Sequence, residues 1–446
     1  MMHFRFTAML MAACIAVAAD AHSLTGKWTG TLNAGMQKMT LVIRIADEAH
    51  AWLDSPDQMA LDIACDSINL SPTTAYLRIK RFGMALNLSL NAETNTLEGS
   101  FQQGLARLPI AFDFADSNPY LNRPQTPVPP FPYEEREVTF SSQGATLAGT
   151  LTLPKGKKGL TAVVLVTGSG TQNRDEELMG HKPFAVIADY LTRQGIAVLR
   201  YDDRGAGASS AGSIDNTTLD FADDALAAVR YLRSVPEINK KKIGIAGHSE
   251  GGEIAVMLAA EHSREVAFIV SIAGPVVKGS DLLLRQGEDL AKAGKGTFGD
   301  AEKAKMMRIY AAIDSIHDTD ALRSRLTQIL REGATPAQLL GIDKQVAALT
   351  TPWYTHFVRY NPIIHLQQVR CPMLAIYGGH DVQVSLEQNS TVLKNAYQGK
   401  RLKQLLYPAH NHLMQHCSQP SIDYGNIDQT IDPIVLEDMA EWIKKQ

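Results

Sequence analysis

The sequence predicts an α/β protein in which helices flank a mostly parallel sheet, preceded by a small antiparallel β domain. From Val138 onward, short apolar runs alternate with amphipathic stretches of helical spacing. From Leu24 to Phe114, apolar and polar residues instead alternate at period two. Between these regions lies the proline-rich segment Asn118–Tyr133. Prolines neither donate to a β-ladder nor continue a helix, so we expect an extended linker there and two folded domains.

The first residues resemble an export signal rather than part of a domain. Arg5 precedes an apolar run from Thr7 to Ala19, and Ala19-Asp20-Ala21 fits a cleavage site. We therefore expect residues 1–21 to be a signal peptide and the mature protein to be periplasmic or secreted. A lipoprotein anchor at Cys14 is the less favoured alternative, because much of the apolar run follows that cysteine.

Residues 22–117 are expected to form a β-barrel or β-sandwich. The runs "TLVIRI" (Thr40–Ile45) and "YLRIKRF" (Tyr76–Phe82) alternate as half-buried strands do, and turns such as "NAETNTLEG" separate the runs. Trp28 and Trp52 could stack on a sugar, but aromatic residues of a barrel more often belong to its core. We favour the structural role.

Residues 134–446 are expected to form the α/β domain, with residues 118–133 as the linker. Its apolar runs are continuous, as in parallel strands that are buried on both faces. Helix-like stretches separate them, which favours right-handed crossovers. Residues 275–366 interrupt this alternation, since they are charged, rich in Ala and Leu and free of strand patterns, and we expect a helical insertion there. The predicted strands are "TAVVLVTG", "GIAVLRYD", "KKIGIAG", "VAFIVSIAG", "CPMLAIYGG" and "KQLLYP".

Composition excludes several classes of function. The 446-residue chain has a formal net charge of -4, which offers no basic surface for nucleic acid. No apolar run in the mature chain is long enough to span a membrane. Cys65, Cys371 and Cys417 form no C-x-x-C pair, so no metal site is expected. A Cys371–Cys417 disulfide is possible, but buried free thiols are favoured. The oligomeric state stays open, a homodimer included.

The stretch "KKIGIAGHSEGGEIAVMLAA" places one serine at the joint between a strand and a helix. Ser249 is the serine of a G-x-S-x-G motif, with an apolar run before it and an alanine-rich helical pattern after it. A sharp turn at this joint would hold the serine in a strained conformation, and side chains at Gly247 or Gly251 would collide with neighbouring elements. The hydroxyl would then stand at a helix N-terminus, where negative charge is favoured. Ser249 is therefore the predicted nucleophile of a nucleophile elbow.

A serine nucleophile needs a base, and the base needs a carboxylate that orients it. In this architecture the acid and then the histidine follow the serine along the chain. "MLAIYGGHD" places Asp381 directly after a predicted strand, and "KQLLYPAHNHLMQH" offers three histidines after the last strand. We expect Asp381 to be the acid and His412 the base. His410 is the alternative weighed against it, and His416 is the third histidine of this segment.

The oxyanion of the transition state needs hydrogen-bond donors. One is expected to be the backbone N–H of Glu250, and the other the N–H of Ser169 in the loop after the first long parallel strand. For the Glu250 carboxylate, we favour an ion pair with Arg174 or Arg204 over a chemical role. In "YDDRGAGASS", Asp203 and Arg204 are expected to form a structural ion pair.

Several of these stretches resemble the α/β-hydrolase superfamily. They are "GSGTQNRDE", "YDDRGAGASS", "GHSEGGEIA", "GGHD" and "NHLMQ". They are most similar to bacterial esterases that carry a small β-barrel-like domain. The stretches "GKWTGTL", "LDSPDQ" and "LAGTLTLP" of this chain are also similar to that group. The resemblance implies an α/β-hydrolase fold with a helical cap, and it places the nucleophile, acid and base at Ser249, Asp381 and His412.

The chain also departs from that family at three positions. Thr171 stands where proline is frequent, Asn173 where aspartate is frequent and Met414 where phenylalanine is usual. These changes would reshape the wall of the pocket and leave the three predicted catalytic residues intact.

The favoured function is a serine hydrolase that cleaves small carboxylic esters through an acyl-enzyme, without a metal or organic cofactor. One alternative is a serine peptidase or amidase of the same fold. Another is a surface protein that binds glycans without catalysis, although a complete set of catalytic residues argues against it. Trp353 and Tyr354, from the helical insertion, are expected to line the substrate pocket.

Overall fold

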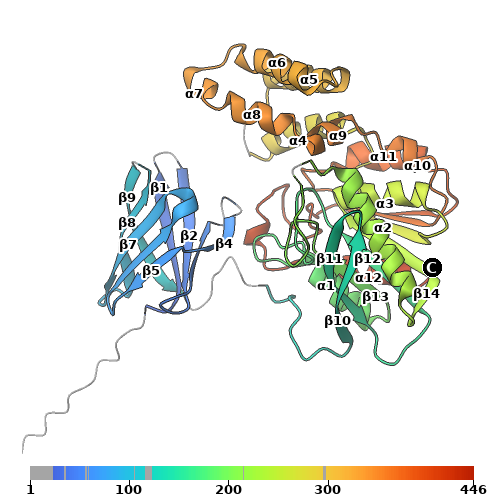
Figure 1. Ribbon diagram of the computed structural model, residues 1–446, viewed down its shortest axis with the longest axis horizontal. Helices are drawn as coiled ribbons and strands as arrows, with labels where there is room; N and C mark the ends of the chain where they lie inside the picture. The colour runs from blue at the N-terminus through green and yellow to red at the C-terminus, as the bar shows by residue number, and fades with distance from the viewer. Residues whose placement is uncertain are drawn as a thin grey trace, which may run out of the picture. The chain divides into compact units, whose positions relative to one another are not determined.

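The computed structural model describes residues 24–446 apart from 35–36, 56–57, 59, 105, 116–122, 214 and 295–297. The predicted signal peptide, with Cys14, and the first residues of the predicted linker lie outside these described residues. The chain divides into two compact units between Pro119 and Tyr120. Each unit is described by itself (Figure 1).

The first unit is a strongly curved antiparallel sheet. Its strand order is β4-β3-β2-β1-β9-β8-β7-β6-β5, so β4 and β5, which are consecutive in sequence, form the two edges of a half-barrel. This arrangement confirms the antiparallel β domain that the sequence predicts. The elements are β1 Gly26–Ala34, β2 Gln37–Ile45, β3 Ala51–Ser55, β4 Ala60–Ala64, β5 Ser67–Leu70, β6 Thr74–Ile79, the short helix η2 Lys80–Phe82, β7 Met84–Asn91, β8 Thr96–Gln103 and β9 Ala106–Ala115.

The period-two pattern gives this unit its own core. Alternate residues such as Leu41, Ile43 and Ile45 of β2 are buried in it. Trp28 belongs to the same core, where its indole N–H donates to the carbonyl oxygen of Leu24 at 3.0 Å. Trp28 therefore has the structural role that the sequence predicts. Trp52 is only half-buried.

The described part of the predicted linker is bound to the second unit. The Arg123 guanidinium donates to the carbonyl oxygens of Met179 at 2.8 Å and Gly425 at 3.0 Å. The Gln125 amide donates to the carbonyl oxygen of Ile431 at 2.7 Å. From Arg123 on, the segment is thus packed rather than free, because each of these side chains meets backbone acceptors of distant loops.

The second unit contains an eight-stranded mixed sheet in the order β10-β11-β13-β12-β14-β15-β16-β17. The strands from β13 to β17 run parallel, whereas β10 and β11 form an antiparallel hairpin at one edge. The six strands predicted from continuous apolar runs are the six parallel strands. The elements outside the insertion are β10 Glu134–Ser142, β11 Ala145–Leu153, β12 Leu160–Val166, α1 Pro183–Arg193, β13 Ala197–Tyr201, α2 Thr218–Ser234, β14 Ile238–His248, α3 Glu250–Glu261, β15 Phe268–Ile272, β16 Met373–Gly378, α11 Leu386–Ala396, β17 Leu402–Tyr407, η4 Tyr424–Asn426 and α12 Pro433–Ile443.

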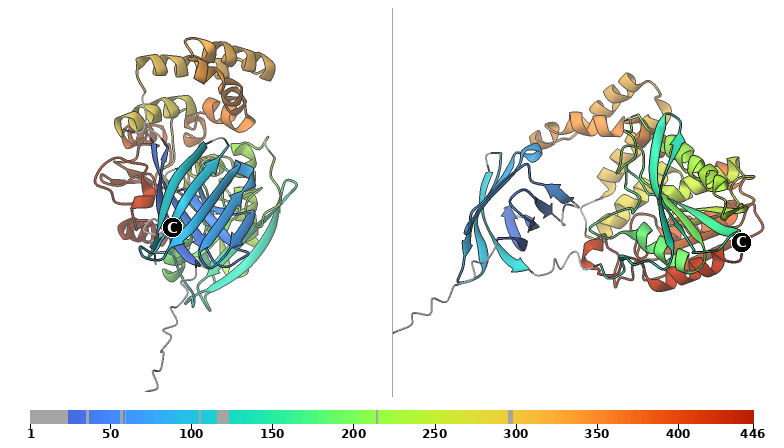
Figure 2. Two further views of the ribbon diagram at one scale, coloured as in Figure 1. Left: turned by 90° about the vertical axis from the view of Figure 1, so that its left-hand side faces the viewer. Right: turned by 60° about the horizontal axis from the view of Figure 1, so that its bottom comes forward.

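Helices cover both faces of this sheet, which is why its strands are apolar throughout. On β12, Val163 and Leu165 belong to the core beneath α1 and α12. Their neighbours Val164 and Val166 belong to the core beneath α2 and α3. The two helical layers can be followed in Figure 1 and Figure 2. The carboxyl ends of the parallel strands therefore meet at one edge, where loops can gather functional residues.

The predicted insertion between β15 and β16 is helical and carries its own core. Residues such as Ile309, Leu326 and Val358 pack together there. Within the described residues, no helix has the length and apolar character needed to cross a membrane. Cys65, Cys371 and Cys417 are free thiols, so the possible Cys371–Cys417 disulfide is not formed. The helices of the insertion are α4 Gly279–Lys292, α5 Asp300–Ser315, α6 Thr319–Arg331, α7 Pro336–Leu339, α8 Ile342–Leu349, α9 Pro352–Arg359 and α10 Ile363–Leu366.

Candidate active site

Ser249 occupies the sharp turn that joins β14 to α3. Its φ of 52° and ψ of -119° lie in a region that non-glycine residues rarely adopt. Holding a residue there costs of order 1–3 kcal/mol, which the packed surroundings must offset. The backbone N–H of Ser249 donates to the carbonyl oxygen of Ile272 at 2.9 Å, tying the turn to β15. Unlike residues 243–248, the buried end of β14, Ser249 is partly exposed.

The glycines around this turn are required by close backbone approaches. A Cβ on Gly247 would stand 1.9 Å from the carbonyl oxygen of Gly251. A Cβ on Gly251 would stand 2.1 Å from the carbonyl oxygen of Val166. Both distances are far inside van der Waals contact, so the collisions expected from the sequence are confirmed.

We expect Gly247→Ala to destabilise the second unit by about 3 kcal/mol or more, because the methyl group would have to displace the backbone of α3. Thermal unfolding monitored by circular dichroism measures this change. Gly156→Ala is the matched control. Gly156 has a φ of +69°, but a methyl group added there would meet nothing within 4 Å, so only the conformational cost of about 1 kcal/mol applies. Equal melting temperatures for the two variants would contradict the steric account.

The structure brings Asp381 and His412 together. Asp381 follows β16 and His412 follows β17, and their side chains meet through a 2.7 Å contact between His412 Nδ1 and Asp381 Oδ2. The other carboxylate oxygen, Oδ1, accepts the backbone N–H groups of Gln383 at 2.7 Å and Val384 at 2.9 Å. Both side chains are buried. The carboxylate is thus held in one orientation and can fix the tautomer of the imidazole.

The other two histidines of this loop have different surroundings. His410 Nε2 lies 3.0 Å from Asp432 Oδ2, at the start of α12. His416 forms an isolated backbone bridge with His410. Among these three histidines, His412 is the one whose ring contacts Asp381.

The turn at Ser249 and the loop of His412 are in contact through His248. The rings of His248 and His412 have centroids 4.7 Å apart. His248 Nε2 also lies 3.1 Å from the carbonyl oxygen of His412. Three segments that are far apart in sequence thus converge at the carboxyl ends of β14, β16 and β17.

The glycine loop, residues 167–182 between β12 and α1, lies against the same turn. A Cβ on Gly168 would stand 3.2 Å from the Cβ of Ser249. The next residue, Ser169, is exposed. Glu250 begins α3, and the first N–H groups of a helix have no acceptor within that helix. Gly168, the neighbour of Ser169, and Glu250, the first residue of α3, are thus both next to Ser249.

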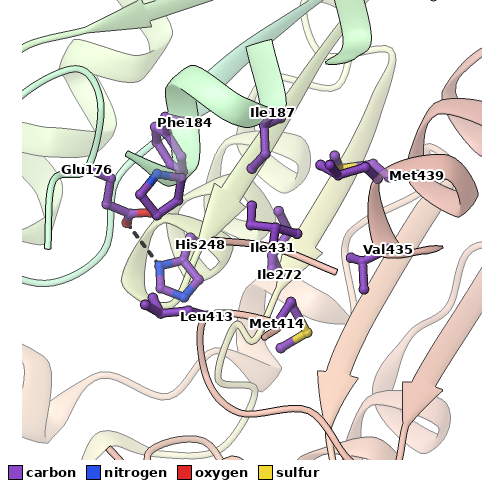
Figure 3. A pocket seen from close by; sticks show the side chains of 12 residues that line it. Glu176, Phe184, Ile187, His248, Ile272, Leu413, Met414, Ile431, Val435 and Met439 are labelled. Atoms are coloured by element: carbon purple, nitrogen blue, oxygen red, sulfur yellow. Dashed lines mark hydrogen bonds and ion pairs between the residues drawn. The ribbon is translucent and has the colours of Figure 1, made fainter. Parts of the chain in front are cut away.

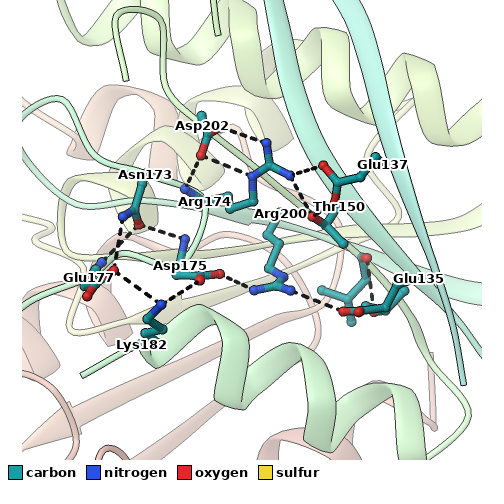
Figure 4. Close-up of polar contacts among 12 residues, drawn as sticks. Glu135, Glu137, Thr150, Asn173, Arg174, Asp175, Glu177, Lys182, Arg200 and Asp202 are labelled. Atoms are coloured by element: carbon teal, nitrogen blue, oxygen red, sulfur yellow. Dashed lines mark hydrogen bonds and ion pairs between the residues drawn. The ribbon is translucent and has the colours of Figure 1, made fainter. Parts of the chain in front are cut away.

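A network of ion pairs fixes the glycine loop to the sheet (Figure 4). Arg174 Nη2 lies 2.8 Å from Asp202 Oδ2, and Nη1 lies 2.6 Å from Glu137 Oε2. Arg200 pairs with Asp175 on the same loop. Burial by itself raises the pKa of Asp202, but hydrogen bonds from Arg174 and from backbone N–H groups outweigh burial and lower it.

The predicted Asp203–Arg204 ion pair is wrong. Arg204 binds Asp224 of α2 in a bidentate manner, at 2.5 and 2.7 Å. Asp203 instead accepts from the Thr167 hydroxyl at 2.9 Å and the Gln172 N–H at 2.8 Å. Burial raises the pKa of Asp203 to about 7. Both residues follow the end of β13, and Arg204 stands in a turn, from which its side chain reaches α2 rather than Asp203.

The predicted pairing of Glu250 with Arg174 or Arg204 is also wrong. The Glu250 carboxylate accepts from the Thr218 hydroxyl at 2.6 Å and the Trp353 indole N–H at 2.9 Å. It also has a hydrogen bond with the Ser169 side chain. Burial is the main cause that raises its pKa. One carboxyl group therefore joins α2, the glycine loop and the helical insertion next to Ser249.

The two predicted pocket aromatics have ring centroids 6.2 Å apart but pack against different cores. Trp353 contacts Glu250 and packs against the main core beneath α3. Tyr354 packs against the core of the insertion and hydrogen-bonds with Tyr310. Although the two residues are adjacent on α9, Trp353 reaches Glu250 beside Ser249, whereas Tyr354 reaches Tyr310 in the insertion.

A groove with a volume of about 580 Å³ opens beside the Asp381 loop, between α4 and α11. Arg285, Asp289 and Lys292 line one wall. The side chain of Asp381 has no exposed surface, so its carboxylate faces His412 rather than this groove. Among the described residues, no group of three His, Cys, Asp or Glu side chains is placed to hold a metal ion.

Sequence reasoning missed His248, Glu176 and Thr218. Each contributes a buried polar contact next to Ser249. His248 stands inside the G-x-S-x-G motif and could have been singled out as a titratable residue at the turn. Nothing in the local pattern around Glu176 or Thr218 indicates that their side chains are buried.

The chain is similar to proteins of known family. A family model described as the alpha/beta hydrolase fold matches residues 161–446, more than half of the chain. Esterase EstD of Thermotoga maritima is 27% identical over 328 residues, which span 71% of this chain and 69% of that protein. Esterase FrsA of Yersinia pestis is 30% identical over 148 residues, only 33% of either chain. The solved structure of Est1E from Butyrivibrio proteoclasticus with ferulic acid is 19% identical, covers 69% of this chain and 96% of that one, and has a TM-score of 0.44. The match of the family model to residues 161–446 shows that this chain belongs to the α/β hydrolase family.

Proposed function

We propose that this α/β hydrolase is a carboxylesterase that uses Ser249 as nucleophile, His412 as general base and Asp381 as the acid that orients the base. The observation that carries the proposal is the 2.7 Å contact between His412 and Asp381 in a loop that touches the turn of Ser249. Similarity to EstD and FrsA, both named esterases, supports a hydrolase of the carboxylesterase type.

In the proposed reaction, the Ser249 hydroxyl attacks the ester carbonyl while His412 Nε2 takes its proton. The C–O bond to the alcohol then breaks, and the imidazolium returns the proton to the leaving oxygen. Water, deprotonated by His412, hydrolyses the acyl-serine and restores the free enzyme. Asp381 holds Nδ1–H of His412 throughout and stabilises the imidazolium.

The backbone N–H groups of Glu250 and Ser169 are proposed to bind the oxyanion. Each such donor contributes roughly 3 kcal/mol in other hydrolases. The Glu250 side chain supports this role indirectly. Its bonds to Thr218 and Trp353 fix the first turn of α3, which carries one of the two N–H groups.

A fluorophosphonate probe tests the proposal, because it reacts only with an activated serine. We expect stoichiometric labelling of the full chain, located at Ser249 by peptide mass spectrometry, and competition by p-nitrophenyl esters. Absence of labelling on folded protein would contradict the proposal and would favour a binding protein without catalysis.

A substrate panel separates ester from amide chemistry. We expect p-nitrophenyl acetate and butyrate to be hydrolysed with kcat/KM at least about a hundredfold above that for matched p-nitroanilides, because amide cleavage must protonate a poorer leaving group. Faster turnover of aminoacyl amides or peptides would instead assign the same residues to a peptidase.

A further inference from the structure

His248 has an unusual pair of hydrogen-bond partners. Its Nδ1 lies 2.9 Å from Glu176 Oε1, and its Nε2 lies 3.1 Å from the carbonyl oxygen of His412. The proposed mechanism uses neither His248 nor Glu176. Figure 3 shows the two side chains facing each other, with the contact drawn as a dashed line.

Both partners of the ring are acceptors. A backbone carbonyl oxygen can only accept, so Nε2 must carry a proton. Glu176 Oε1 also accepts the backbone N–H of Gly168 at 2.7 Å, so this oxygen already acts as an acceptor. With that oxygen accepting, Nδ1 must carry a proton as well. A ring that donates from both nitrogens is an imidazolium.

We propose that His248 is held as an imidazolium at neutral and mildly alkaline pH and that, paired with the Glu176 carboxylate, it positions the loop of His412 and the glycine loop against the turn of Ser249. The pair joins three segments. Glu176 binds the N–H of Gly168, His248 belongs to the turn, and the ring binds the carbonyl oxygen of His412. These two are positioning residues, since neither reaches the reacting atoms in the proposed mechanism.

The surroundings keep this charge pair away from water. His248 and Glu176 border a small cavity of about 20 Å³ with apolar walls (Figure 3). In so apolar a place, a charge is stable only with a partner that bears the opposite charge. The apolar residues around the cavity are Pro183, Phe184, Ile187, Ile272, Leu413, Met414, Ile431, Val435, Leu436 and Met439.

The charges that face His248 favour the protonated ring. Burial by itself lowers the pKa of His248, but the charge and hydrogen bond of Glu176, the bond to His412 and the charge of Asp381 together raise it. The pKa of His248 is thus higher in the folded protein than in the unfolded chain. Protonation of His248 therefore stabilises the fold fully below the unfolded pKa, and this stabilisation is lost as pH rises through the folded pKa. The ring of His412, whose centroid lies 4.7 Å from that of the His248 ring, is a further titratable group packed against His248.

His181 provides a matched control inside the same chain. It is also a buried histidine, but its Nδ1 faces the Thr430 hydroxyl at 2.8 Å, and its Nε2 lies 3.0 Å from the carbonyl oxygen of Tyr424 and 3.1 Å from the amide nitrogen of Gln415. The Thr430 hydroxyl can either donate or accept, so these contacts fit a neutral ring that carries a single proton. Burial lowers the pKa of His181 to about 4. The two buried rings should therefore differ in protonation at neutral and mildly alkaline pH.

Nitrogen-15 NMR of the full chain labelled at histidine ring nitrogens measures this difference at pH 8. We expect one slowly exchanging ring with protons on both nitrogens, assigned to His248 by its absence from H248N. A second buried ring, absent from H181N, should carry a single proton. The wild-type spectrum is decisive even if a variant fails to fold. If it contains no doubly protonated buried ring at pH 8, the proposal is wrong.

The E176Q variant tests the positioning role. It removes the negative charge but keeps an oxygen that can accept from Gly168. We expect His248 to lose its second proton at pH 8 and kcat for a p-nitrophenyl ester to fall at least about tenfold, with KM changed less than about twofold, because small displacements of reacting groups are costly. An unchanged kcat would overturn the proposed positioning role of His248 and Glu176. The kinetic readout depends on the proposed esterase function, whereas ring protonation does not, so failures of the two proposals are distinguishable.

Discussion

Replacement of Ser249 by alanine is expected to lower kcat for p-nitrophenyl ester hydrolysis by about 10⁴- to 10⁶-fold, because without the hydroxyl no acyl-enzyme can form. The fold should persist. Ser249 makes no side-chain capping bond at α3, and alanine meets the same positive φ as serine. Steady-state kinetics and thermal unfolding of the purified variant measure the two effects separately.

A control distinguishes this loss from a general effect of serine substitution. Ser234 is exposed at the end of α2, and Ser234→Ala should retain both activity and labelling by the fluorophosphonate probe. If Ser249→Ala hydrolyses the ester at the wild-type rate while remaining folded, the assignment of the nucleophile is wrong.

Asp381→Asn is expected to lower kcat by about 10⁴-fold, through the tautomer of His412 rather than through a loss of packing. Asp381 Oδ1 accepts two backbone N–H groups, from Gln383 and Val384. The single side-chain oxygen of asparagine must accept these two N–H groups, so its NH₂ group must face His412 Nδ1. Nδ1 then has to accept, the ring proton moves to Nε2, and the base can no longer take the Ser249 proton.

The second Asp–His contact of the chain supplies the control for this variant. Asp432 Oδ2 lies 3.0 Å from His410 Nε2, and Asp432 also caps α12, a place that asparagine fills equally well. We expect Asp432→Asn to keep kcat within about twofold of wild type. The reverse result, a large loss for Asp432→Asn and none for Asp381→Asn, would move the base from His412 to His410.

Local sequence features predict the parts of the site that depend on chain neighbours. The turn at Ser249 follows from the glycines at 247 and 251, since the contacts they avoid involve residues close to the turn or the adjacent strand. The parallel strands follow from continuous apolar runs, because such strands are buried on both faces. The position of Asp381 follows from the same rule, as it comes directly after one of these strands.

The hydrogen-bond partners of charged side chains could not be predicted from local sequence features. Glu250 was expected to pair with an arginine, yet it binds Thr218 and Trp353, the latter 103 positions away. Arg204 was expected to bind its neighbour and instead binds Asp224. The choice depends on which element packs over each side chain, and a list of residue types does not contain that information.

By itself, the sequence determined the fold class, the turn that presents Ser249 and the strand ends from which an acid and a base would come, because backbone sterics and apolar periodicity act over a few neighbouring residues. Only the tertiary structure decided that His412 rather than His410 meets Asp381, and that His248 meets Glu176 across 72 positions. Such contacts arise when separate strands and loops are brought to one edge of the sheet, and burial there makes each unsatisfied polar group costly enough to select a single partner.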